Sequence, residues 1–123
     1  MATSVTSQSD PYVDKLVVDT QANATPENHV LGSAAANYIF DVDNSNNSAA
    51  VYAKFFDIGV AGVTVGTTEP SILMLVPANT RQVLTVSSGV AFATGLSFAC
   101  VAGKATSNAV NPVNNVTIRV MAE

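Results

Sequence analysis

The chain has 123 residues, of which 48% are hydrophobic and 11% charged, and its formal net charge is −4. This length fits one domain with a core of its own, and the balance of residues excludes a disordered chain. The five basic residues are scattered along the sequence: Lys15, Lys54, Arg81, Lys104 and Arg119. Because phosphate groups are bound by clustered cations, we expect neither a nucleic-acid nor a membrane partner. No apolar stretch reaches the ~20 residues of a membrane helix, and the N-terminal residues lack the pattern of a secretory signal.

The polar N-terminal segment is predicted to be separate from the folded domain. Residues 1–10 are rich in Ser and Thr, and Thr3, Val5 and Thr6 favour a strand without a partner strand in this segment. We therefore expect residues 1–10 to form an arm that is flexible or ordered by a partner. Residues 11–123 are predicted to form a single β-sandwich domain.

The first half of the domain alternates strand and turn signals. Residues 12–20 are the first strand candidate, and residues 21–28 are a loop by composition. The alanine run at residues 34–36 could open a helical turn, but the strand-like residues 38–42 follow directly. Residues 43–48 predict a turn, because Asn, Asp and Ser side chains close local hydrogen-bonded turns.

Residues 50–57 alternate as a strand does. Their side chains fall on two faces, with Val51, Ala53 and Phe55 on one and Tyr52, Lys54 and Phe56 on the other. We predict that this strand forms a hairpin with residues 38–42. The first face is predicted to line the core, and a loop or another subunit is predicted to cover Tyr52 and Phe56.

Short strands and turns continue along the rest of the chain. The predicted strands are residues 71–76, 81–86, 90–94, 96–101 and 116–120, and the predicted turns include residues 77–79 and 87–89. Together the pattern gives about seven or eight short strands, with turn signals roughly every eight to twelve residues. That spacing predicts an all-β fold, an antiparallel β-sandwich or jelly roll, rather than alternating strands and helices.

Residues that could carry chemistry are few and isolated. Cys100 is the only cysteine and lies between apolar neighbours, so we predict a core residue rather than a nucleophile. The only histidine, His29, would need a nucleophile and a carboxylate such as Asp19 or Glu27 to act in catalysis. Solvent exposure or a subunit contact is favoured for His29. The sequence has no group of His and Cys residues with zinc-site spacing.

Three further groups have both a chemical and a structural interpretation. Residues 41–46 are similar to an oxygen-rich calcium loop but lack the glycine and distal glutamate of an EF-hand, so an Asx turn is favoured. Asp57 and Glu69 are the best carboxylate pair for glycosidase-type chemistry, yet their spacing does not distinguish them from loop residues. Several aromatic residues could form a sugar-stacking platform, but the chain has no Trp, so core packing is favoured: Tyr12, Tyr38, Tyr52, Phe55 and Phe56. We predict no catalytic residue, no metal site and no cofactor.

Four short motifs follow one another between residues 48 and 99. A strand at residues 51–57 is followed by a loop ending in Val-Gly-Thr-Thr-Glu-Pro at residues 65–70, and then by an apolar strand and a proline turn. A hydrophobic strand comes next, followed by the segment at residues 90–99. In this order they resemble a family of small structural proteins of tailed bacteriophages, including cyanophages. The resemblance covers roughly two-fifths of the chain and leaves the first 45 or so residues outside it. Where the family often has Asp or Thr, this chain has Thr68 and Glu69.

The resemblance implies a β-sandwich component of a virion. We expect a capsid decoration (cement) protein on the capsid surface, bound to the major capsid protein and assembled as a homo-oligomer, with a trimer favoured. The low charge content suits a subunit that packs against other protein, and we do not expect an enzyme. The alternatives are a structural component of the neck, tail or baseplate, and a host-surface carbohydrate- or receptor-binding module.

Overall fold

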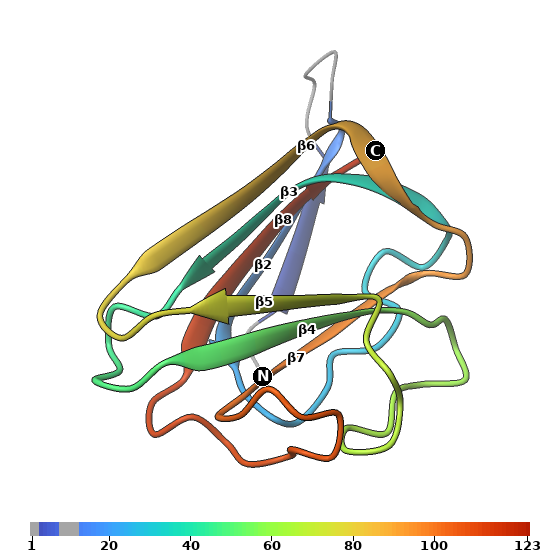
Figure 1. Cartoon of the computed structure of the whole chain (residues 1–123). Helices are drawn as coiled ribbons and strands as arrows, with labels where there is room; N and C mark the ends of the chain where they lie inside the picture. Colours follow the sequence, from blue (N-terminus) through green and yellow to red (C-terminus); the bar gives the residue numbers. More distant parts are fainter. Residues whose placement is uncertain (1–2, 8–12) are drawn as a thin grey trace.

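The computed structural model describes residues 3–7 and 13–123, and these residues form eight β-strands and no helix (Figure 1). The strands are β1 (Thr3–Ser7), β2 (Lys15–Ala22), β3 (Ala35–Asp43), β4 (Val51–Asp57), β5 (Ile72–Val76), β6 (Arg81–Phe92), β7 (Leu96–Val101) and β8 (Val116–Ala122). The predicted all-β fold is therefore confirmed. None of these residues forms a helix able to cross a membrane.

The strands form two antiparallel sheets that face each other. The larger sheet has the order β1-β2-β8-β3-β6 and the smaller sheet the order β5-β4-β7. β8 lies inside the larger sheet, between β2 and β3 (Figure 1). Both sheets contribute buried side chains to one core, including Val17, Phe40, Val42, Ile118 and Val120 from the larger sheet and Val51, Ala53, Phe55, Met74 and Phe98 from the smaller one.

The predicted hairpin of residues 38–42 with residues 50–57 is wrong, because the two strands lie in different sheets. β3 pairs with β6 and β8, whereas β4 pairs with β5 and β7. Their apolar faces instead meet across the core, where the ring centres of Phe40 and Phe55 are 4.7 Å apart. Alternation of apolar residues specifies only which side chains face the core. Two strands paired in a hairpin and two strands facing each other from different sheets therefore have the same alternation.

The two faces of β4 are as predicted. Val51, Ala53 and Phe55 are buried in the core. Phe56 lies on the opposite face and is also fully buried, because the chain that follows β4 folds over it and places Val63 against the ring. Of the two predicted covers for Phe56, a loop or another subunit, the loop is confirmed. Tyr52, on the same face, is half-buried.

The alanine run at residues 34–36 does not open a helical turn. β3 begins at Ala35, and its first residues pair with the end of β6, with Ala35 opposite Phe92. Long-range pairing therefore overrides the local preference of alanine for a helix, as it commonly does for short runs.

The predicted turn at residues 87–89 is also absent, because β6 runs from Arg81 to Phe92 as one strand. Gly89 has a positive φ of 78°, and nearby the pairing of β6 with β3 shifts register between Asn37 and Ile39. A glycine accepts this backbone without the strain that a side chain would add. The sequence signal for a turn thus corresponds to a bulged bend within a longer strand.

The N-terminal strand is paired within its own chain. β1 is antiparallel to β2, with Thr3 opposite Asp19 and Thr6 opposite Leu16. These strand-forming residues therefore have a partner in the same chain, which differs from the expected arm that a second protein would order. Residues 1–2 and 8–12 of the chain lie outside the described residues, so the predicted boundary between residues 10 and 11 stays a prediction.

Candidate functional site

A hollow of about 470 Å³ lies on the outer face of the larger sheet. It is lined by side chains of β3, β6 and β8 and by Val13, which precedes β2. The other lining residues are Tyr38, Ile39, Thr85, Val86, Ser87 and Met121. The lining contains no charged group and no histidine or cysteine. This composition fits the binding of an apolar group rather than acid–base or nucleophilic chemistry.

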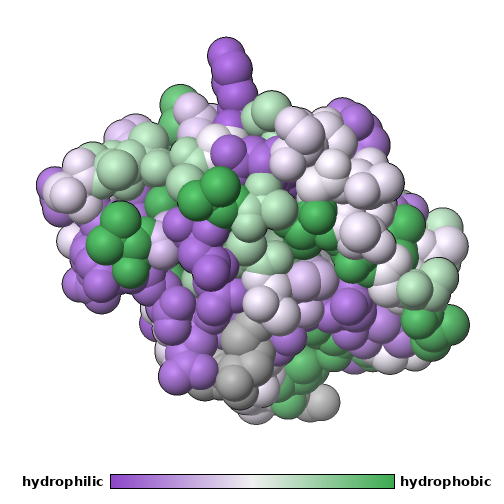
Figure 2. Space-filling model, turned by 90° about the horizontal axis from the view of Figure 1, so that it is seen from below, coloured by the Kyte–Doolittle hydropathy of each residue, from purple (hydrophilic) through white to green (hydrophobic). Residues whose placement is uncertain are grey.

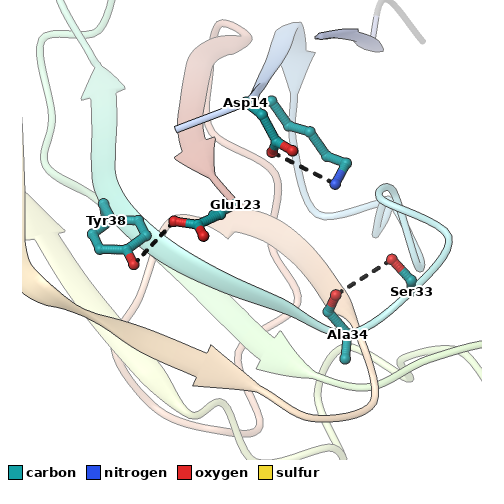
Figure 3. Close-up of polar contacts among 6 residues, drawn as sticks. Asp14, Ser33, Ala34, Tyr38 and Glu123 are labelled. Carbon is teal, nitrogen blue, oxygen red and sulfur yellow. Dashed lines mark hydrogen bonds and ion pairs between the residues drawn. The ribbon is translucent and has the colours of Figure 1, made fainter. Parts of the chain in front are cut away.

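Tyr38 adds one polar contact beside this hollow. Its hydroxyl points toward the carboxylate of Glu123 and donates a long hydrogen bond of 3.4 Å to it (Figure 3). The negative charge of Glu123 raises the pKa of Tyr38, so the phenol stays protonated at neutral pH. The other contacts drawn in Figure 3, Asp14 with Lys15 and Ser33 with the carbonyl of Ala34, are exposed surface contacts.

Asp57, one member of the predicted carboxylate pair, fixes the turn between β6 and β7. Its carboxylate accepts hydrogen bonds from the backbone N–H groups of Ala93, Thr94 and Gly95, and from the Thr94 hydroxyl at 2.8 Å. Partial burial acts to raise the pKa of Asp57, but these hydrogen bonds outweigh it and hold the pKa below its usual range. The carboxylate is therefore ionised and serves as a structural acceptor.

Glu69, the second member of that pair, has a different partner. Its carboxylate accepts a hydrogen bond from the Thr106 hydroxyl at 2.9 Å, in the long loop before β8. In the described part of the chain, no hydrogen bond links Glu69 with Asp57 or gives them a common partner. The structure thus uses the two acids at two separate loop contacts.

His29 lies in a close-packed position at the base of a loop. Its backbone N–H donates to the Ser97 hydroxyl, which in turn donates to the carbonyl of Ile58. A Cβ placed on Gly95 would come within 2.4 Å of His29 Nδ1, so only glycine fits beside the ring. His29 Nδ1 is buried, and no residue that the structure describes forms a hydrogen bond with it. His29 as a whole is half-buried, so the predicted solvent exposure holds only in part and does not extend to Nδ1.

Cys100 is a core residue, as predicted. It lies in β7 with a relative exposure of 0%, and burial raises the pKa of its thiol to about 12. A thiol with this pKa is protonated at neutral pH and is a poor nucleophile.

Of the residues that resembled a calcium loop, 41–43 end β3, and the chain continues from Asp43 in the favoured Asx turn. The carboxylate of Asp43 accepts the Ser45 N–H, and hydrogen bonding with the side chain and then the backbone of Ser45 lowers the pKa of Asp43. Asn44 is buried and donates to the carbonyls of Ala49, Val76 and Pro77. Its amide therefore connects the β3–β4 loop to the end of β5. Across the described residues, no cluster of His, Cys, Asp and Glu has a geometry for metal binding.

A network of asparagines at this end of the sandwich was not predicted. The Asn47 amide donates to Asn44 Oδ1 and to the carbonyl of Asn114, and its oxygen accepts the Asn114 N–H at 2.7 Å. Side-chain amides thus join three loops that are distant in the sequence: the β3–β4 loop, the β5–β6 loop and the β7–β8 loop. The abundance of Asn in the sequence signals turns, but it does not indicate which turns contact each other.

A buried ammonium group is the second feature that sequence analysis missed. Lys54 in β4 has 0% exposure, and its Nζ donates to the backbone carbonyls of Ala105, Thr106 and Asn108. Desolvation lowers the pKa of Lys54, while the charge of Glu69 acts in the opposite direction. Three carbonyl acceptors match the three protons of an ammonium, so the group is fully satisfied and holds the loop before β8 on the sheet.

A pair of acids lies beneath β1. Asp19 has 0% exposure, its Oδ1 accepts the Gln21 N–H, and among the described residues its Oδ2 has no hydrogen-bond partner. Desolvation raises the pKa of Asp19, and the nearby charge of Glu27 adds to this effect. Glu27 itself accepts a hydrogen bond of 2.6 Å from the Thr3 hydroxyl. The two acids that were considered as partners of His29 thus contact the N-terminal strand instead.

The aromatic residues do not form one exposed platform. Phe55 and Phe56 are fully buried, and the rings of Phe55 and Phe98 pack with their centres 6.3 Å apart. The favoured interpretation as core packing is confirmed for these phenylalanines. Tyr12 lies outside the described residues. Figure 2 shows hydrophobic and hydrophilic residues intermixed on one face of the molecule, without a single continuous apolar patch.

Comparison with known proteins found no match to the chain among protein families, curated proteins or solved structures.

Proposed function

We propose that the chain is a structural protein of a bacteriophage virion, a decoration (cement) protein that stabilises the capsid by bridging major capsid proteins. The observation that carries the proposal is the resemblance of residues 48–99 to small phage structural proteins. In the fold this segment begins just before β4 and ends within β7, so it contains all of β4, β5 and β6. The motifs therefore include the three strands of the smaller sheet, with β7 in part, and the edge strand β6 of the larger sheet.

The use of polar groups supports a structural role. The polar side chains that form several hydrogen bonds each hold a loop against the sheets. They are Asn44, Asn47, Lys54 and Asp57. The apolar hollow beside Tyr38 offers contact area rather than a reactive group. Such a subunit contributes to an assembly through buried surface.

Cementing requires contact with more than one capsid subunit. Stable interfaces bury about 1,600 Å² in total, and a homo-oligomer on a symmetry axis multiplies weak contacts through effective concentration. We propose a homotrimer at such an axis, on the outer surface of the head. The low charge of the chain removes much of the repulsion between neighbouring copies.

The number and position of copies in purified particles test this proposal. Quantitative mass spectrometry of virions, with immunogold labelling, is expected to find on the order of hundreds of copies on the head, as a shell-wide lattice requires. About six or twelve copies at one vertex would instead support the neck, tail or baseplate alternative. Absence from the particles, together with specific binding on a glycan array, would favour the carbohydrate-binding module and refute the virion role.

A further inference from the structure

The outer edge of β5 is open. β5 is the end strand of the smaller sheet, and within the described residues its strand partner is β4 alone (Figure 1). The opposite edge of this sheet is closed, because β7 exchanges backbone hydrogen bonds with the loop after β2, both ways between Glu27 and Phe98 and once between Val30 and Leu96. One edge is thus protected by the chain itself. The other has no strand partner among the described residues, although the Val76 carbonyl at the end of β5 accepts a side-chain hydrogen bond from Asn44.

β5 lacks the features by which edge strands avoid pairing. Soluble proteins protect such edges with charged residues, internal prolines or bulges. The sequence of β5 is Ile-Leu-Met-Leu-Val, with prolines only outside it at Pro70 and Pro77, and its register with β4 is regular. Leu73 and Leu75 point away from the core and are 44% and 52% exposed. Apolar side chains and free backbone groups therefore lie together on this edge.

The sequence of β5 is complementary to itself. Read in either direction it has a β-branched residue at each end, a leucine next to each end, and Met74 at the centre. In an antiparallel pair of two such strands, directly opposite residues lie on the same face. Leu73 would lie opposite the partner's Leu75 on the outer face, and Ile72 opposite the partner's Val76 on the core face.

We infer that β5 is an interaction surface for a second copy of this chain, which pairs through its own β5 about a two-fold axis at Met74. The two smaller sheets then form one six-stranded sheet. A charged residue close to a two-fold axis is repelled by its own copy in the partner. β5 contains no charged residue, so this repulsion does not arise within the strand. The contact is centred on five residues of each strand, which is well below a standard interface. We therefore expect a weak dimer with a Kd of roughly 10 µM to 1 mM.

This inference does not depend on the proposed function, because it follows from the strand alone. A two-fold contact also differs from the three-fold contact of the proposed trimer, so the two can be distinguished by mass. Pairing through β5 gives a dimer in solution, or links trimers in pairs if both contacts form.

Sedimentation equilibrium of the full chain at concentrations up to about 1 mM tests the pairing. The Leu75→Lys variant is expected to raise the Kd at least about tenfold, because two lysines would flank the axis, and Leu73→Lys serves as a second variant. The matched control is Val83→Lys, since Val83 is 50% exposed and lies in β6 of the other sheet. A monomer at every concentration, or an equal effect of the control, would overturn the inference. So would an oligomer that survives both leucine substitutions.

Cysteine crosslinking tests the register. A mixture of the Leu73→Cys and Leu75→Cys variants is expected to form disulfide-linked dimers on mild oxidation, because directly opposite Cβ atoms lie about 4.5–5.5 Å apart. Each variant alone places its cysteines on the diagonal, about 7–8 Å apart, and is expected to crosslink several-fold less. Native Cys100 is buried and contributes no competing thiol. Equal crosslinking of the single variants and the mixture would show that the strands do not pair about Met74.

Discussion

Truncation of Phe55 to alanine is expected to cause a large loss of stability. The ring has 0% exposure and packs edge-to-face on Phe40, with ring centres 4.7 Å apart, and lies 6.3 Å from Phe98. Removal of a buried phenylalanine ring costs about 3–5 kcal/mol, and aromatic pairs contribute about 0.5–1.5 kcal/mol beyond the area they bury. Because Phe55 joins β4 of the smaller sheet to β3 of the larger one, we expect about 4 kcal/mol.

This loss can be measured by urea unfolding followed by far-ultraviolet circular dichroism, which needs no tryptophan. A change of about 4 kcal/mol corresponds to a decrease in Tm of roughly 15 °C for a domain of this size. The control is Val83→Ala on the exposed face of β6, which is expected to change stability by less than about 0.5 kcal/mol. A loss below about 1 kcal/mol for Phe55→Ala, in a protein with an unchanged spectrum, would refute the assignment of this face to the core.

Three other substitutions probe two loops and the buried Asp19 of β2. Gly95→Ala places a Cβ 2.4 Å from His29 Nδ1 at a φ of +150°, and we expect a lower Tm and altered NMR chemical shifts of the His29 ring; unchanged shifts would contradict the close packing. Lys54→Met keeps the apolar stem but leaves three loop carbonyls without their donor, so limited proteolysis is expected to cut residues 102–115 faster while the core stays folded. For Asp19, the raised pKa means that the ionised form is disfavoured in the folded state, so Asp19→Asn is expected to increase stability at pH 7. That gain should vanish as the pH falls below the ordinary carboxyl range, where wild-type Asp19 is protonated in both states, and a gain independent of pH would exclude ionisation as its cause.

Local patterns in the sequence predicted most strands, because the chain alternates where one face of a strand is buried. Residues 116–120 show this clearly, since Val116, Ile118 and Val120 are all fully buried. The partner of each strand could not be predicted in the same way. The crossing between β3 and β4 depends on contacts of Asn44 with the distant carbonyls of Val76 and Pro77, which leave no local signature.

The candidate site was predictable only in part for a similar reason. Core packing of Cys100 follows from its apolar neighbours, and the Asx turn follows from the local preference of Asp43. The hydrogen bonds from Lys54 to the loop before β8 were not predictable, because their acceptors are backbone carbonyls, which every residue carries. Likewise, Asp57 resembles any loop acid until the turn at Thr94 is placed against it.

The position of β8 has a consequence for the order in which the molecule can be built. This strand leaves the ribosome after both of its neighbours, β2 and β3, yet it lies between them in the larger sheet. Until residues 116–122 have emerged, β2 and β3 each have an edge that lacks its final partner. Contacts between residues so far apart in the sequence slow folding, and unpaired strands are prone to aggregate during that delay. The sheet is therefore completed after synthesis of the strand rather than during it, and the yield of folded protein should be sensitive to the temperature and rate of expression.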